Sequence, residues 1–169
     1  MGIDSHVHLL SGTYTGAWQD TDLTQSAVNN PSNPGAFPNP AVGSALASSS
    51  GLNWGGVGEV VAYIGADGDV HHLRWDKTFS AWTHTDLTSG ASGTALGVSG
   101  TALGVAVVQL DGDYALSEHV VYIGNDGYVR DLSLDEKFQT WFNNNLTSSA
   151  TATAPIPNSA LAIYVGPAW

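Results

Sequence analysis

Residues 59–88 read EVVAYIGADGDVHHLRWDKTFSAWTHTDLT, and residues 118–147 read EHVVYIGNDGYVRDLSLDEKFQTWFNNNLT. When the two stretches are aligned at a constant offset of 59 residues, 14 of the 30 positions are identical and no gap is needed. Identity of this extent at one fixed period indicates an internal repeat. The chain is therefore predicted to consist of copies of one small structural unit.

A third copy, cut short, stands at the start of the chain. DSHVHLL at 4–10 aligns with DGDVHHL at 67–73, and AWQDTDLT at 17–24 aligns with AWTHTDLT at 81–88. The sequence also repeats a short apolar element ahead of each unit: SALASS from residue 44, TALGVAVV from 101 and SALAIYV from 159. The chain therefore begins with the end of a unit and ends with the start of one.

Each full unit is predicted to form four short β-strands. The turns ADG at 66–68 and NDG at 125–127 contain glycines that accept the positive φ of a tight hairpin. Linkers rich in proline and glycine separate the units at 29–43 and 153–157. No segment has helical periodicity of useful length. In the second unit the strands are expected over 44–50, 59–65, 69–75 and 81–87.

Alternation along the strand at 69–75 assigns side chains to the two faces of the sheet. Leu73 and Trp75 share one face, and His72 and Arg74 share the other. Adjacent histidines such as His71 and His72 therefore point in opposite directions and are not expected to share a metal ion. The residues expected in the hydrophobic core are the repeated apolar ones: Tyr63, Tyr122, Leu87 and Leu146.

Repeated four-stranded units of roughly 60 residues are typical of a β-propeller. A β-helix would need shorter repeats, and a sandwich would show no internal identity. We predict an all-β propeller of about three blades. The expected organisation is a single domain over 1–169, with a partial blade at 1–24 joined by 159–169, a blade at 44–88 and a blade at 101–147.

The predicted ring is incomplete. Known propellers use roughly four to eight blades, and open sheet edges pair with other chains. We therefore expect a homo-oligomer, most simply a dimer that closes a ring of about six blades.

Charge and composition narrow the possible partners. The net charge is −11, from 15 acidic and 4 basic residues, so nucleic acid and anionic membrane surfaces would be repelled. No apolar run approaches the roughly 18 residues of a membrane span. There is no cysteine, hence no disulfide framework and no thiol nucleophile. The start of the chain lacks the features of a signal peptide, so a cytoplasmic or non-classically exported protein is expected.

The stretch GIDSHVHLL at 2–10 resembles the metal-binding first strand of amidohydrolases, in which two histidines one residue apart hold an ion. An amidohydrolase barrel needs about 250 residues, more than the 169 present. The repeat alignment places His6 and His8 opposite Asp69 and His71, and opposite other polar residues in the third copy. We interpret them as tolerant polar positions and expect neither a metal nor a cofactor.

The unit VVYIGNDGYVRDL at 120–132, followed by Trp141 and by Leu-Thr at 146–147, resembles the blades of fungal and bacterial fucose-specific lectins, which are β-propellers. The resemblance covers both full copies and the partial one. It implies sugar sites between adjacent blades, where an arginine and a glutamate of one blade hold the ring hydroxyls. Tryptophan side chains of the neighbouring blade cover the apolar face of the sugar. The resemblance therefore implies a lectin with glycan partners, including fucosylated ones.

Carried over by position, the resemblance nominates specific side chains for sugar binding. The pocket most like the family's combines Asp131 with Trp75 and Trp82. Val61 and Val120 stand where the family has its arginine, so Arg74 and Arg130 are the candidate replacement cations. The residues nominated for sugar binding are Trp75, Trp82, Asp131, His72, Arg74, Arg130, Trp141 and Trp18.

The chemistry of such a site follows from the sugar. A pyranose has one face of C–H groups that suits an indole ring, and a rim of hydroxyls that donate to a carboxylate. Single sites of this kind bind at roughly millimolar to micromolar concentration, and a ring of sites gains about 10²- to 10⁴-fold by multivalency.

Other interpretations remain open. Trp18, Trp82 and Trp141 recur at one repeat position, which also fits packing between blades, whereas Trp75 does not recur. No carboxylate pair, nucleophile elbow or phosphate loop indicates an enzyme. Two alternatives to a lectin are a structural or protein-interaction propeller without sugar sites, and a natural or engineered propeller fragment.

Overall fold

The computed structural model describes most of the chain and shows an all-β fold. Its described strands are antiparallel and form three sheets, accompanied by three short helices. No helix in the described part is long and apolar enough to span a bilayer. The described residues are 4–12, 16–31, 33, 37–41, 44–50, 57–76, 80–91, 98–109, 116–135, 140–155 and 161–163.

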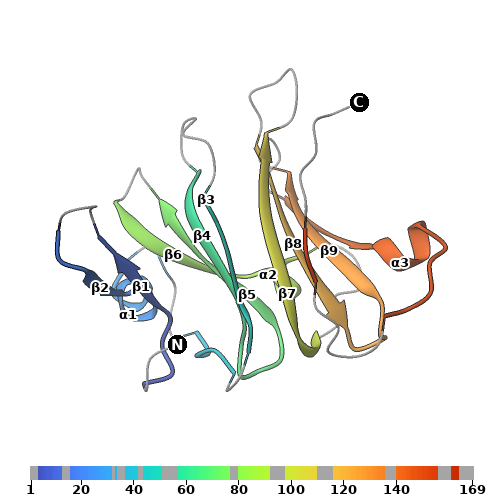
Figure 1. The fold of residues 1–169 in the computed structure, drawn as a ribbon, viewed down its shortest axis with the longest axis horizontal. Coiled ribbons are helices and arrows are strands. Elements are labelled where there is room, and N and C mark those ends of the chain that lie inside the picture. Colours follow the sequence, from blue (N-terminus) through green and yellow to red (C-terminus); the bar gives the residue numbers. More distant parts are fainter. Residues whose placement is uncertain are drawn as a thin grey trace.

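The three sheets follow one another along the chain and stand side by side (Figure 1). The first sheet pairs β1 (His8–Ser11) with β2 (Gln19–Asp22). The second, in the order β3-β4-β5-β6, contains Leu46–Ser50, Val57–Ile64, Val70–Asp76 and Ala81–Asp86. The third, in the order β7-β8-β9-β10, contains Val98–Gln109, Leu116–Gly124, Val129–Asp135 and Thr140–Asn145.

The strands predicted for the second unit are confirmed, with ends that differ by no more than two residues. The hairpin turns are confirmed as well, because Gly68 and Gly127 adopt φ of 87° and 79°. In the first of these turns, Gly68 N donates to Gly65 O at 3.0 Å, and Gly65 N donates to Asp69 O at 2.9 Å.

Three short helices were not predicted. They are α1 (Leu23–Val28), α2 (Leu87–Gly90) and α3 (Leu146–Ser149), and each follows the last strand of its sheet. Each begins after an N-cap whose side chain accepts a backbone N–H of the first turn: Asp22, Asp86 and Asn145. Helices of four to six residues are too short to show a hydrophobic period, so only the capping residues signalled them.

The threonine of each repeated Leu-Thr pair ties its helix to the same sheet. In every unit the hydroxyl oxygen accepts the backbone N–H of a valine just before or at the start of the third strand of the repeat. The three bonds join Val7 N to Thr24 Oγ1 (3.0 Å), Val70 N to Thr88 Oγ1 (2.7 Å) and Val129 N to Thr147 Oγ1 (2.8 Å). The Leu-Thr motif is therefore part of the framework.

The core consists of two apolar layers, one on each face of the second sheet. The layer between the first and second sheets contains Val7, Leu23, Ala27, Val61, Tyr63, Leu73 and Trp82. The layer between the second and third sheets contains Val60, Ala62, Val70, Leu87, Val120, Tyr122, Leu132, Leu134 and Trp141. Four residues of the first layer have their repeat equivalents in the second at the offset of 59, so one kind of junction is used twice.

The core predictions hold with one exception. Tyr63, Tyr122 and Leu87 are buried, but Leu146 is exposed. Leu87 packs against the third sheet, whereas no described sheet follows the third one to cover Leu146.

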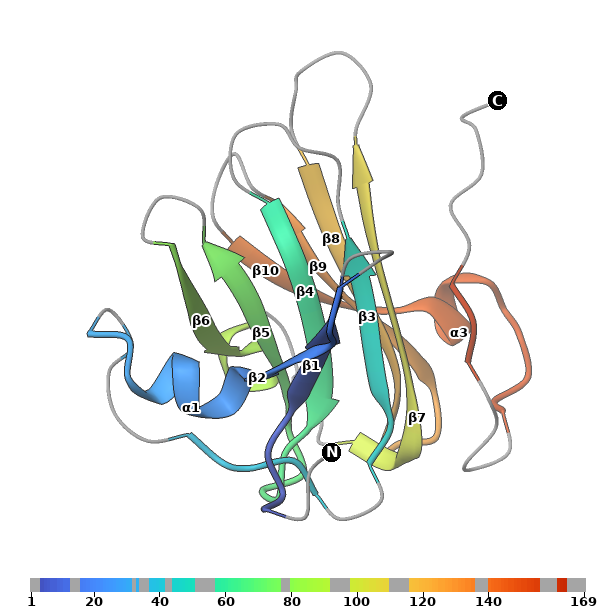
Figure 2. The same cartoon turned by 60° about the vertical axis from the view of Figure 1, so that its left-hand side comes forward.

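Helix α1 contacts both β2 and β6 and so bridges the first and second sheets (Figure 2).

The strand expected from residue 159, which was to join the partial unit, falls largely outside the described residues. Of that stretch only 161–163 is described, and it is not in a strand.

Candidate functional site

A polar cavity of about 210 Å³ lies between the second and third sheets. Its walls offer hydrogen-bond donors and acceptors around one indole ring, a composition that suits a small polar ligand. The lining side chains are His72, Arg74, Asp76, Thr83 and Thr85 from the second sheet, and Leu134 and Trp141 from the third.

The β-strand period explains this lining. His72, Arg74 and Asp76 occupy every second position of β5, so their side chains share one face of the sheet. The predicted alternation is confirmed, since His72 and Arg74 line the cavity whereas Leu73 lies in the core layer on the opposite face.

A buried pair orients the imidazole at the base of the cavity. His72 Nδ1 lies 2.9 Å from Glu118 Oε1, and both side chains are almost completely buried. The His72 ring meets Trp141 edge-on, with centroids 5.5 Å apart and an interplanar angle of 81°. Glu118 on β8 thus fixes the imidazole against the indole.

A second cavity, of about 250 Å³, lies between the first and second sheets. It occupies the equivalent place in the repeat, because Leu9 stands for His72, Glu59 for Glu118 and Trp82 for Trp141. It is less polar where Leu9 replaces the imidazole. Its lining is Leu9, Ser48, Ser49, Glu59, Val60, Val61 and Trp82.

The structure brings together three of the nominated sugar-binding residues. His72, Arg74 and Trp141 line the same cavity. Trp82 lines the other cavity, and Trp75 packs edge-on against Trp82 with centroids 5.8 Å apart.

The expected pocket of Asp131 with Trp75 and Trp82 is not formed. The two indoles belong to the layer between the first and second sheets. Asp131 lies on β9 of the third sheet, where its Oδ1 is 3.1 Å from His119 Nδ1. Trp82 faces the first sheet. Asp131 lies next to Leu132, which faces the second sheet, so by strand alternation Asp131 points away from the second sheet and from Trp82.

Two further nominated residues have other positions. Arg130 pairs with Asp126 across the hairpin turn at 2.5 Å and donates to Asn143 Oδ1 at 3.1 Å, so it holds the turn rather than a pocket. Trp18 is exposed on the first sheet.

No protein-family model, curated protein or solved structure matches this chain.

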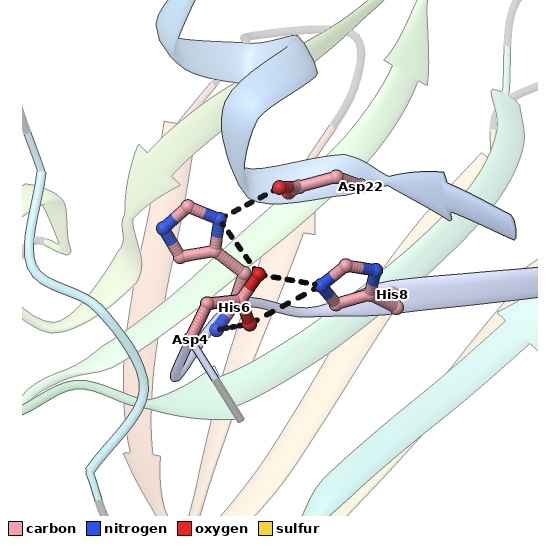
Figure 3. A group of neighbouring side chains, drawn as sticks. All are labelled: Asp4, His6, His8 and Asp22. Carbon is pink, nitrogen blue, oxygen red and sulfur yellow. Dashed lines mark hydrogen bonds and ion pairs between the residues drawn. The ribbon is translucent and has the colours of Figure 1, made fainter. Parts of the chain in front are cut away.

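A cluster of titratable side chains lies at the start of β1 (Figure 3). His6 Nδ1 is 2.7 Å from Asp22 Oδ2, and His8 Nε2 is 3.1 Å from Asp4 Oδ2. One potential ligand atom from each of the four side chains lies within 4.8 Å of the others. Two imidazole nitrogens and two carboxylate oxygens could together hold a zinc-like ion. The repeat alignment predicts tolerant polar positions at His6 and His8 and does not place them beside Asp22.

Most of this cluster has a framework role that recurs in the repeat. His8 pairs with Asp4 four residues earlier, as His71 pairs with Asp67 and Arg130 with Asp126. Asp22 caps α1. Only His6 has no counterpart of the same kind in the other units. The hydrogen bond to Asp20 is the main cause that raises the pKa of His8, and the hydrogen bond from His6 N lowers the pKa of Asp4.

The half-buried His84 on β6 has a strongly shifted pKa. The His84 ring stacks on Phe37 at 3.9 Å, and its Nε2 lies 3.0 Å from His71 Nδ1. Burial, and then the neighbouring His71, lower the pKa of His84 from 6.5 to about 4. The imidazole is therefore neutral in the folded protein near pH 6.

We expect His84 to make the fold less stable in mild acid. Below pH 6.5 the unfolded chain binds a proton at His84, while the folded chain does so only near pH 4. Stability therefore falls as the pH drops through this window, by at most about 2 kcal/mol given the partial exposure of the ring. Urea unfolding of the wild type and His84→Gln at several pH values measures this. If the free energy of unfolding depends on pH equally in the two proteins, His84 is not the source of the acid sensitivity.

Proposed function

We propose that the protein is a non-catalytic carbohydrate-binding protein, that its sheets are blades of a β-propeller, and that the cavities between sheets hold sugars. The observation that carries the proposal is the cavity in which Trp141 meets His72 and Arg74. A second cavity at the equivalent place supports it, because a repeated site is what a multivalent lectin uses.

The chemistry of the first cavity suits a single sugar ring. Trp141 offers an apolar surface to the C–H face of a pyranose. Asp76 can accept hydroxyl donors, and Arg74 can donate to ring or hydroxyl oxygens through charge-assisted bonds. The volume of about 210 Å³ is below the range of roughly 300–1,000 Å³ for drug-sized ligands. A neutral monosaccharide unit is therefore the proposed ligand.

Fucosylated glycans are the first ligands to test, because the blade motifs resemble those of fucose-specific lectins. The arginine of that family is replaced by Val61, which lines the second cavity. Arg74, which stands on β5 rather than on β4, is the proposed substitute in the first cavity. The second candidate function, a protein-interaction propeller, is favoured by the smaller polar content of the cavity around Leu9 and Val61.

Removal of the Arg74 guanidinium tests the sugar site. We expect wild-type protein to bind at least one neutral or fucosylated sugar on a glycan array, with a dissociation constant of roughly millimolar to micromolar. Arg74→Ala should weaken that binding by about tenfold or more, since a charge-assisted bond is lost. Isothermal titration with the best sugar measures the change.

The control is Asp69→Asn, which changes a charge at the hairpin turn outside both cavities and should leave the affinity unchanged. Absence of binding to every sugar, or equal affinity of Arg74→Ala and wild type, would contradict the proposal and favour the interaction role.

A further inference from the structure

The first sheet presents an apolar face that the other two sheets bury. Leu10 and Trp18 are 65% and 74% exposed. Trp18 lies across Gly12, as Trp82 lies against Trp75 in the second sheet. Their repeat equivalents are between 0% and 8% exposed: Leu73 and Trp82 in the second sheet, Leu132 and Trp141 in the third. The outer face of the first sheet thus has the composition of a junction, but none of the described sheets packs against it.

The third sheet presents the opposite half of the same junction. Leu146 is 38% exposed, although its equivalents Leu23 and Leu87 are fully buried against the following sheet. Phe142 stands where Thr83 lines the cavity of the second sheet and is also exposed. No described sheet follows the third one.

These two faces are complementary because the chain already joins such faces twice. The first sheet packs onto the second, and the second onto the third, through equivalent residues. The unpaired halves lie at opposite ends of the row (Figure 1). We propose that a second copy of this chain docks head to tail, with the partner's Leu10 and the partner's Trp18 against Phe142 and Leu146.

Head-to-tail docking is heterologous, because two different faces meet. It forms a closed ring only if the rotations from each sheet to the next add up to one full turn. Two chains would supply about six sheets, within the range of known propellers. A ring of this kind leaves neither apolar face open. It also accounts for two exposed surfaces with one interaction.

The new junction would contain a third cavity, and this part of the inference rests on the proposed function. By repeat position, Asp131 takes the place of His72, and the partner's Trp18 takes the place of Trp141. Asp131 is held by His119 on the neighbouring strand, with its Oδ1 at 3.1 Å from Nδ1. A carboxylate facing an indole is the arrangement that accepts sugar hydroxyls while covering the C–H face. The junction would therefore bind a neutral sugar, with one wall from each chain.

Sedimentation velocity without sugar tests the docking. We expect wild-type protein to be a dimer. Leu10→Asp and Leu146→Asp should each raise the dissociation constant of the dimer by about tenfold or more. Both side chains are exposed, so the variants should keep the wild-type circular dichroism spectrum. Leu46→Ala, at another exposed leucine, should remain dimeric. A monomeric wild type, or variants as dimeric as Leu46→Ala, would overturn the proposal.

Mixing the two variants tests the head-to-tail direction. Leu10→Asp retains an intact third sheet, and Leu146→Asp retains an intact first sheet. Together they can form one undamaged junction, so the mixture should associate more strongly than either variant alone. Equal association of the mixture and the separate variants would overturn this geometry.

Sugar stoichiometry tests the third cavity. Trp18→Ala should lose one binding site per chain while the sites inside each chain persist. A dimer that binds sugar with unchanged stoichiometry in Trp18→Ala would overturn the junction site. A dimer that binds no sugar at all would overturn both the proposed function and the junction site, and would support docking alone.

Discussion

Glu118→Ala is expected to lower the free energy of unfolding by about 3–5 kcal/mol, because it removes one partner of a buried pair. Glu118 is 1% exposed, and its Oε1 lies 2.9 Å from His72 Nδ1. Without the carboxylate, the buried imidazole loses its hydrogen-bond partner, and the space between the second and third sheets loses a packed side chain. Urea unfolding at a fixed protein concentration measures the change, since association affects apparent stability.

The repeat supplies a matched control for this substitution. Glu59 is the equivalent of Glu118 in the second unit, but it is exposed. Glu59→Ala should therefore change the free energy of unfolding by no more than about 0.5 kcal/mol. Glu118→Gln, which keeps the size and an acceptor oxygen, should cost less than Glu118→Ala. Equal effects of the alanine substitutions at positions 59 and 118 would show that the pair with His72 does not stabilise the junction.

Most of the strand arrangement could be predicted from the sequence because identical residues in two copies enforce the same local structure. The hairpin glycines Gly68 and Gly127 needed positive φ in both copies, and both have it. The ends of the units were assigned less well. Leu87 was placed at the end of the strand predicted over 81–87, yet it opens a helix after the Asp86 cap.

Burial could not be predicted from equivalence alone. Leu87 and Leu146 occupy the same place in the repeat, but among the described sheets one packs against Leu87 and none packs against Leu146. An alignment of repeats gives the face on which a side chain lies, while its exposure depends on what stands opposite that face. Leu146 is exposed where its equivalent Leu87 is buried, and this difference indicates where a partner could pack against an end sheet.

The candidate site shows the same limit. Alternation along β5 correctly placed His72 and Arg74 on one face, and their cavity contains the nominated Trp141. The combination of Asp131 with Trp82 failed because the sequence does not tell which sheet faces which. The hydrogen bond between His72 and Glu118 joins residues from different sheets, and no local pattern signals it.

Leu73→Ala is expected to lower the free energy of unfolding by about 2–5 kcal/mol. Leu73 is fully buried in the layer between the first and second sheets, where it packs with Tyr63 and Trp82. Truncation removes buried methyl groups and leaves a cavity that two facing sheets can only partly close. Urea unfolding measures the loss, and Leu46→Ala, at an exposed position of the same sheet, should stay within about 0.5 kcal/mol of wild type.

The equivalent substitution Leu132→Ala tests whether the two core layers are independent. Leu132 is as deeply buried as Leu73, but it belongs to the layer between the second and third sheets. Because the two leucines share no apolar cluster, the costs of the single variants should add in the double variant to within about 0.5 kcal/mol. If the double variant loses much less free energy of unfolding than this sum, disruption of one layer already disrupts the other. The sheets would then unfold as one coupled stack, and the description of the chain as a series of equivalent, separately packed junctions would be wrong.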